Sequence, residues 1–213
     1  MQHQSLKLKS DLHLVRKLWH CIGISAMAVG YNLLGHKASA MVLIPFAALF
    51  ITVDYLRQSR PWLNQFLVKV FGPVMRRHEY SSISGTSYLF VGTMFLLLFR
   101  DKHIVTLTLL FLAFGDPVAS FAGIRYGKDK ILANKTLQGT MAAFAVCSAI
   151  AALYYYFNNL MTERILIVAP LSGLFGAVAE LFPVGKLDDN LTFPIICSIL
   201  LWVLFKVYGG FGL

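Results

Sequence analysis

Two stretches of this sequence combine residues whose types and spacing suit the chemistry of phosphates and metal ions. The first, 115–139, starts with an acid, Asp116, and continues with cations and with glycines that allow close backbone approach. The cations are Arg125, Lys128, Lys130 and Lys135, and the glycines are Gly123, Gly127 and Gly139. Carboxylates bind Mg²⁺, and lysine and arginine neutralise phosphates. The stretch therefore predicts a nucleoside triphosphate site, although a basic loop can also serve only to orient a membrane protein.

The second stretch, 180–194, places Glu180 before the acidic pair Asp188 and Asp189 and the amide of Asn190. Their oxygen atoms are ligands of the kind that Mg²⁺ takes in proteins. Asp189 or Asn190 can equally cap the helix that follows, which is compatible with a role in a site. The pattern GxxxxGK[S/T] does not occur in the sequence, so a nucleotide site here is not a P-loop.

The composition indicates that membrane-spanning helices position these residues. Of the 213 residues, 57% are hydrophobic and only 14% are charged, whereas about 25% charged is usual in soluble domains. A soluble domain of this length lacks the interior to hide so much apolar surface, and the same figures exclude a disordered chain. The apolar runs are continuous rather than alternating, which argues against a β-barrel. We therefore predict an all-α, polytopic integral membrane protein with a single transmembrane domain, 1–213.

About seven apolar stretches are candidates for transmembrane helices. They cover residues 18–35, 38–56, 84–99, 103–124, 139–158, 164–182 and 191–208. Most approach the roughly 20 residues that a helix needs to cross the hydrocarbon layer. Residues 61–75 are also apolar, but Pro61, Gly72 and Pro73 interrupt them. This segment is predicted to be an interfacial helix that lies on the membrane.

The distribution of Lys and Arg predicts the orientation of these helices. With the N-terminus inside, 14 of the 19 Lys and Arg residues fall on the inner side. The five on the outer side are Lys37, Arg100, Lys102, Arg164 and Lys206. The positive-inside rule then predicts a cytoplasmic N-terminus and an external C-terminus. The same rule accounts for the net charge of +9, so no nucleic-acid partner is expected.

Seven of the ten acids also fall on the cytoplasmic side in this topology. They are Asp54, Glu79, Asp116, Asp129, Glu180, Asp188 and Asp189. An acid at membrane depth is costly and usually marks function. Asp116 lies within an apolar run, and Pro117 after it frees backbone carbonyls in the preceding turn. For Asp54 an alternative without function remains, in which it is simply a polar residue at the end of its helix.

Four blocks of residues together resemble the CTP-dependent lipid-alcohol kinases, which include dolichol kinase, phytol kinase and the yeast-type diacylglycerol kinase. The blocks are Arg16-Lys17-x-x-His20; Glu79 with Ser84-Gly85-Thr86 and Tyr88; Gly115-Asp116 through Gly127-Lys128 and then Lys135-Thr136-x-x-Gly139; and Asp188-Asp189-Asn190-Leu191-Thr192-x-Pro194. They are spread over nearly the whole chain, and the third and fourth are the most specific. The sequence is more distantly similar to phosphatidate cytidylyltransferase.

The resemblance implies that the γ-phosphate of CTP is transferred, with Mg²⁺, to a membrane lipid alcohol such as a polyprenol, a phytol-type alcohol or diacylglycerol. The expected metal ligands are Asp116, Asp188, Asp189 and Glu180. The expected nucleotide-binding residues are Arg125, Gly127, Lys128, Lys130, Lys135, Thr136 and Asn190. Asp116 is the first choice for the carboxylate that takes the hydroxyl proton and Asp54 the second, and Lys135 is expected to stabilise the transferring group. We expect the site to be closed from the N-terminal side by Arg16, Lys17 and His20. Glu79 is also an expected site residue, because it belongs to the second of the four blocks.

Three other functions remain open at this stage. A cytidylyltransferase would carry a longer signature after the second acidic stretch, whereas here Asp189 runs directly into Asn190, which favours a kinase. A small transporter predicts two inverted halves, and the sequence has no such repeat. A non-catalytic membrane subunit would have no need for Asp116 together with the basic loop. The acceptor alcohol and the oligomeric state are not predicted.

Overall fold

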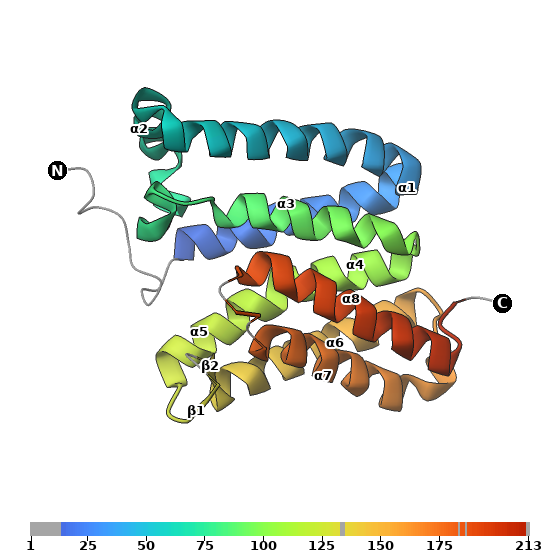
Figure 1. The fold of residues 1–213 in the computed structure, drawn as a ribbon. Helices are drawn as coiled ribbons and strands as arrows, with labels where there is room; N and C mark the ends of the chain where they lie inside the picture. The colour runs from blue at the N-terminus through green and yellow to red at the C-terminus, as the bar shows by residue number, and fades with distance from the viewer. Residues whose placement is uncertain (1–13, 133–134, 183, 186, 212–213) are drawn as a thin grey trace.

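Helices make up most of the chain in the computed structural model, which describes residues 14–132, 135–182, 184–185 and 187–211 (Figure 1). The α-helices are α1 (Leu14–Ser59), α2 (Pro61–Phe71), α3 (Gly85–Leu96), α4 (Lys102–Leu110), α5 (Asp116–Tyr126), α6 (Leu137–Phe157), α7 (Ile165–Leu181) and α8 (Asp189–Tyr208). Short 3₁₀ turns cover Gly72–Val74, Arg77–Tyr80, Leu97–Phe99 and Thr162–Arg164. Two strands, β1 (Lys130–Leu132) and β2 (Lys135–Thr136), form an antiparallel hairpin that the sequence did not predict. The prediction of an all-α protein is confirmed apart from this hairpin.

The long helix α1 consists of two arms that meet at Gly35. The backbone of Gly35 is not helical, with φ at 72° and ψ at 174°. Glycine adopts positive φ without the steric cost of a Cβ atom, so the chain can reverse at this position. Figure 1 shows the first arm running beside α3 and the second arm returning along the outside of the bundle. Gly35 lies at the boundary between the predicted segments 18–35 and 38–56.

Five helical segments in the described part of the chain are long and apolar enough to cross a membrane. They are Leu14–Ser59, Lys102–Tyr126, Leu137–Phe157, Thr162–Leu181 and Asp189–Tyr208. The prediction of an integral membrane protein agrees with these segments, but the count of seven spans is not confirmed. Gly85–Phe99 is apolar but shorter than the roughly 20 residues of a full span, and the first two predicted spans form the single bent helix α1.

Helix α2 occupies the place of the predicted interfacial helix 61–75. Pro61 stands in its first turn, where a proline has no hydrogen bond to lose. Asn64 and Val68, four residues apart on one face, are buried, whereas Trp62 and Phe66 are exposed. Gly72 and Pro73 then form a 3₁₀ turn, so the helix ends at Phe71. Its position on a membrane surface stays a prediction.

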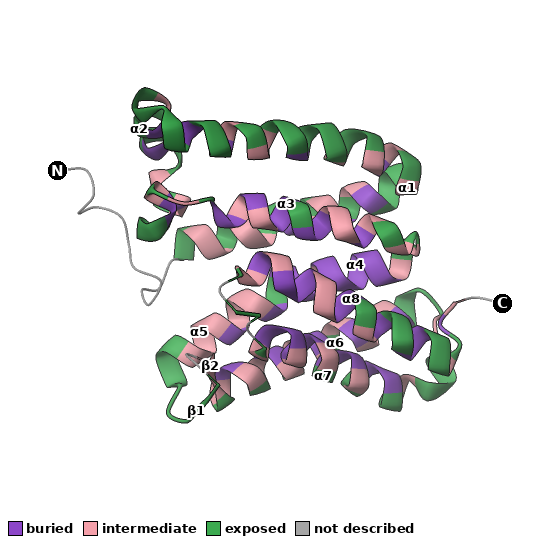
Figure 2. Cartoon of the chain, in the orientation of Figure 1, coloured by how far each residue is buried: buried purple, intermediate pink, exposed green. Residues whose placement is uncertain are grey.

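The buried core is formed by α4, α6, α7 and α8 together with the first arm of α1 and with α3, and its buried segments are purple in Figure 2. Its largest fully buried side chains include Phe111, Tyr155, Phe193 and Phe205. The second arm of α1 instead exposes large apolar side chains such as Met41 and Leu49 along most of its length. Exposed apolar side chains of this kind suit a helix that faces lipid rather than water.

Candidate active site

Asp116 begins α5 directly after a π-helical turn, Phe111–Gly115, that interrupts the rod formed by α4 and α5. Pro117 has no N–H to donate to the preceding turn, and π-turns within helices occur frequently at functional sites. A Cβ atom on Gly115 would come within 2.7 Å of Cys147 Sγ, so the rod packs closely against α6. The Asp116 side chain remains 24% exposed and accepts no hydrogen bond from a described residue.

Two residues of the first arm of α1 face Asp116. His20 Nε2 lies 4.0 Å from Asp116 Oδ2, and Lys17 interacts electrostatically with the same carboxylate. Lys17 Nζ and His20 Nε2 are both buried and have no hydrogen-bond partner among the described residues. A buried polar atom without a partner is costly in free energy and uncommon in proteins. These nitrogens beside an open carboxylate therefore suit an anionic ligand.

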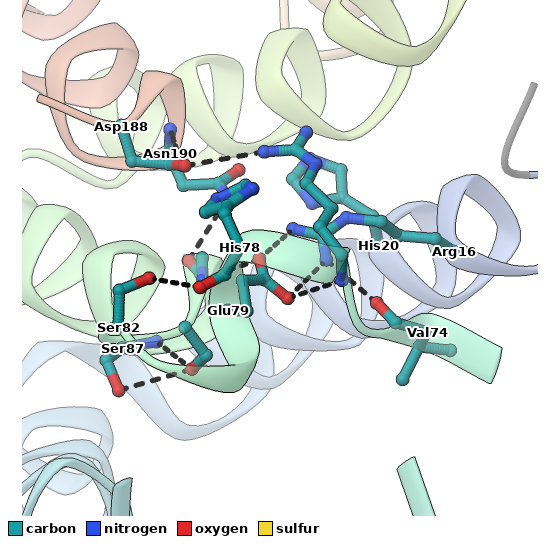
Figure 3. A network of polar contacts seen from close by, with 12 residues as sticks. Arg16, His20, Val74, His78, Glu79, Ser82, Ser87, Asp188 and Asn190 are labelled. Atoms are coloured by element: carbon teal, nitrogen blue, oxygen red, sulfur yellow. Dashed lines mark hydrogen bonds and ion pairs between the residues drawn. The ribbon is translucent and has the colours of Figure 1, made fainter. Parts of the chain in front are cut away.

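Glu79 fastens the first arm of α1 to the loop that follows α2. Its Oε2 accepts from Arg16 Nη1 at 3.0 Å, its Oε1 lies 2.9 Å from Arg16 Nη2 in an ion pair, and Arg16 Nη1 also donates to the Val74 carbonyl at 2.8 Å. The backbone N–H groups of Arg76 and Gly85 donate to the same carboxylate at 2.9 and 3.1 Å. Figure 3 shows this network, in which Arg16 and Glu79 point toward each other.

These contacts also set the protonation of Glu79, which is only 1% exposed. Burial alone would raise its pKa, but the Arg16 guanidinium and the N–H groups of Arg76 and Gly85 outweigh burial and hold the pKa below its ordinary value. Glu79 is therefore an anion that keeps Arg16 fixed at the edge of the site.

Lys135 contacts two of the predicted metal ligands. Its Nζ donates to Glu180 Oε1 at 2.6 Å and to Asp189 Oδ2 at 3.3 Å. Burial would lower the pKa of Lys135, but the carboxylates of Glu180, Asp189 and Asp116 raise it above its ordinary value. The neighbouring Thr136 caps α6 through its hydroxyl, which accepts from Gly139 N at 3.2 Å. Lys135 is thus a permanent cation positioned at the start of α6.

The start of α8 faces the loop that carries Glu79. Asp188 caps this helix, since its Oδ1 accepts from Asn190 N at 3.0 Å, and its Oδ2 lies 3.4 Å from Arg76 Nη1. Asn190 Nδ2 donates to the Gly85 carbonyl at 3.1 Å (Figure 3). A Cβ atom on Gly85 would come within 2.8 Å of Asn190 Nδ2 and 2.6 Å of Arg16 Nη2. A side chain at position 85 would require those of Arg16 and Asn190 to shift, so glycine leaves room for the contacts among α1, α3 and α8.

Three of the predicted nucleotide-binding cations, Arg125, Lys128 and Lys130, are exposed at the end of α5 and on the hairpin. Gln138 holds this loop, because it accepts from Lys128 N at 3.1 Å and donates to Asp129 Oδ2 at 2.9 Å. A Cβ atom on Gly127 would contact Thr136 at 2.7 Å, so the loop packs tightly against the cap of α6.

Asp54 lies in a separate buried ion pair. Arg57 Nε donates to its Oδ1 at 2.6 Å. The Ser84 backbone, the Ser84 hydroxyl and the Ser87 hydroxyl donate to its Oδ2 at 2.8, 3.0 and 2.6 Å. Arg57 in turn donates to the carbonyls of Glu79 and Ser82, both at 2.8 Å. With both oxygens engaged, Asp54 fastens the second arm of α1 to the start of α3.

The four predicted metal ligands do not form a ready metal cluster. In the described part of the chain, no three His, Cys, Asp or Glu side chains are grouped closely enough to hold a metal ion. Glu180 and Asp189 contact Lys135, and Asp188 contacts Arg76. Mg²⁺ is usually held by one or two carboxylates together with waters and phosphate oxygens. The carboxylate of Asp116, without a hydrogen bond from the described residues, fits that mode of binding.

Sequence reasoning missed Arg76, which was counted only as a charge that sets topology. Its contact with Asp188 joins residues 112 positions apart. The signal that could have found it is its place three residues before Glu79, in the same loop as one of the four blocks. For the π-turn, the only indication in the sequence was Pro117.

Known proteins of related sequence support the resemblance. The chain is 30% identical to the CTP-dependent diacylglycerol kinase 1 of Schizosaccharomyces pombe over 165 residues, which cover 72% of this chain and 75% of that protein. The chain belongs to the CTP-dependent lipid kinase family. It is also 27% identical to the Saccharomyces cerevisiae CTP-dependent diacylglycerol kinase 1, over 91% of this chain and 73% of that protein.

A third relative within this kinase family is the dolichol kinase of Saccharomyces cerevisiae. It is 30% identical over 89% of this chain, but the match covers only 36% of that longer protein. No protein-family model matches the chain, and no solved structure matches it significantly. The family assignment therefore rests on sequence similarity over most of the chain, and the geometry above describes a candidate site.

Proposed function

We propose that this protein is a CTP-dependent kinase that transfers the γ-phosphate of CTP to the hydroxyl group of a membrane lipid. The observation that carries the proposal is the open carboxylate of Asp116, which lies among the cations Lys17 and Lys135 at one end of an apolar helical bundle. Phosphoryl transfer depends mainly on positioning and on neutralising charge, and these residues can supply both.

Each residue of the site has a part in this proposal. Lys17, whose buried Nζ has no hydrogen-bond partner among the described residues, binds a phosphate oxygen, and Lys135 neutralises charge on the transferring group. Asp116 would be the principal protein ligand of Mg²⁺, which when bound would neutralise negative charge on the phosphates. Asp116 is also preferred over Asp54 as the group near the lipid hydroxyl, because hydrogen bonds occupy both oxygens of Asp54.

The acceptor we propose is diacylglycerol. The two matches to diacylglycerol kinases cover about three quarters of each relative, whereas the match to dolichol kinase covers about a third of that protein. Such a lipid would keep its acyl chains in the bilayer beside the exposed apolar faces and bring its hydroxyl to the polar end of the bundle.

We further propose that both arms of α1 and the segment Gly85–Phe99 cross the membrane, which gives seven spans with a cytoplasmic N-terminus and site. The support is the reversal at Gly35, which leaves two arms of about 20 residues each, enough for a span. A tilt of neighbouring helices or local thinning of the bilayer would accommodate the shorter segment.

The experiment that tests the reaction follows which phosphate moves. The purified protein is supplied with Mg²⁺, with CTP labelled at either the γ- or the α-phosphorus, and with diacylglycerol or, in a parallel reaction, phosphatidate. A kinase sends the γ-label into the lipid phase and leaves the α-label in water as CDP. Transfer of the α-label to a lipid phosphate, with release of pyrophosphate, would establish a cytidylyltransferase and refute the kinase proposal. Dolichol and phytol in parallel reactions test the choice of acceptor.

A further inference from the structure

The candidate site contains two contacts that each join a cation to an acid at its edge. Lys135 contacts Glu180 and Asp189, and Arg76 contacts Asp188. Lys135 is already a predicted phosphate ligand, whereas Arg76 has no assigned role. Since the two cations neutralise neighbouring acids at the junction of α7 and α8, Arg76 stands in the same relation to the site as Lys135.

The backbone of Arg76 is held by a hydrogen bond, but its guanidinium makes only one long contact. Its backbone N–H donates to Glu79 Oε2 at 2.9 Å, while its side chain is 20% exposed. Only Nη1 contacts an acceptor in the described part of the chain, Asp188 Oδ2, and the distance of 3.4 Å exceeds the roughly 2.7–2.9 Å of a good charge-assisted hydrogen bond. The other guanidinium donors have no partner there, although arginine offers five N–H groups.

Arg76 also lies near the interior of the site. It interacts electrostatically with His20, which lies beside Asp116. Release of Asp188 Oδ2 would not uncap α8, because the capping bond from Asn190 N goes to the other oxygen, Oδ1. A partly exposed and long ion pair is weak, so exchange of Asp188 for a phosphate would cost little. Helix α8 and the loop can therefore stay in place while the guanidinium changes partner.

We propose that Arg76 binds a phosphate group of the nucleotide and leaves Asp188 when the nucleotide enters. The planar guanidinium matches two phosphate oxygens at once, which a lysine cannot do. This inference rests on the proposed function, because it assumes that the site takes a nucleoside triphosphate. It adds a ligand from the loop before α3, opposite the predicted ligands on the hairpin.

A purely structural role for Arg76, as a link between its loop and α8, predicts a different result. Loss of such a link would weaken binding of the nucleoside and of its phosphates equally and would lower stability. A phosphate ligand instead affects only ligands that carry phosphates. Arg77 is a matched control, because it is the next residue, carries the same charge, is exposed and makes no side-chain hydrogen bond or ion pair with a described residue.

The test compares Arg76→Ala, Arg76→Lys and Arg77→Ala in the full-length purified protein. Isothermal titration calorimetry measures binding of cytidine and of CTP, with and without Mg²⁺, and melting temperatures record stability. We expect Arg76→Ala to weaken CTP binding about tenfold or more while cytidine binding stays unchanged. The CTP affinity of Arg76→Lys should lie between those of Arg76→Ala and the unaltered protein. Arg77→Ala should change CTP affinity less than twofold.

Two results would overturn this inference while the proposed function stands: CTP binding to Arg76→Ala as tight as to the unaltered protein, or an equal loss for cytidine and CTP. If Arg76→Ala does not fold, full CTP affinity in Arg76→Lys would overturn the inference. That variant keeps the positive charge but lacks the planar guanidinium that can bind two phosphate oxygens at once. Absence of CTP binding to the unaltered protein would refute the proposed function and this inference with it.

Discussion

Lys135 and Glu180 form a largely buried contact between opposite charges at the proposed centre. Glu180 is 7% exposed, so its carboxylate has given up most of its hydration and depends on the lysine 2.6 Å away. Removing one partner of a buried ion pair is strongly destabilising because the other charge is left uncompensated. A loss of activity in a Lys135 variant could therefore arise from catalysis or from folding.

A pair of variants separates these two roles of Lys135. Lys135→Ala should lower the free energy of unfolding by about 3 kcal/mol, and the melting temperature should fall with it. The same variant should lower kcat/KM by at least about tenfold. Lys135→Ala combined with Glu180→Gln removes the uncompensated charge, so stability should largely return while kcat/KM stays low. Recovery of activity together with stability in the double variant would show that Lys135 acts only as a structural partner of Glu180.

At the scale of elements, the loop between α2 and α3 joins three parts of the bundle. Glu79 in its 3₁₀ turn contacts Arg16 of α1 and the N–H of Gly85, at the start of α3, and the Gly85 carbonyl contacts Asn190 of α8. Because Glu79 is buried and ionised, the strength of this junction depends on pH.

The sign of that dependence follows from the lowered pKa of Glu79. A carboxyl group whose pKa is lower in the folded than in the unfolded protein stabilises the fold above its unfolded pKa, about 4.5, and this contribution is lost as pH falls through the folded value. Glu79→Gln should therefore lower the melting temperature by several degrees at pH 7, and the difference from the unaltered protein should shrink toward pH 3. Glu163→Gln, at an exposed position, should show no such difference.

Apolar patterning predicted the helices well because membrane spans are long runs with sharp polar ends. The predicted segment 139–158 corresponds to α6, and 191–208 corresponds to α8. The π-turn before Asp116 and the hairpin after α5 could not be predicted, since each depends on how one element packs on another. The chemical types of the side chains identified the candidate site residues. The pairing of Arg76 with Asp188 is a contact between distant parts of the chain that no local sequence pattern encodes.

The whole molecule is a bundle with different ends. The start of α8, the hairpin and α2 lie at one end in Figure 1, whereas the turn after α6 lies at the other. The acids and cations of the proposed site gather at the first end, while the second arm of α1 exposes apolar side chains between the two. A membrane around the apolar faces would therefore separate the two ends, so that the site opens to one compartment only.

This separation predicts which residues are accessible from each side. Lys130, on the hairpin, and Asn158, at the end of α6, are both exposed and stand at the two ends of α6, a segment long enough to span. In sealed vesicles, Lys130→Cys should react with a membrane-impermeant maleimide only from the cytoplasmic side, and Asn158→Cys only from the other. The unaltered protein is the control for its own thiols, of which Cys147 and Cys197 are buried. Labelling of both positions from one side would refute a membrane-crossing α6, and reversed sides would refute the orientation inferred from the Lys and Arg distribution.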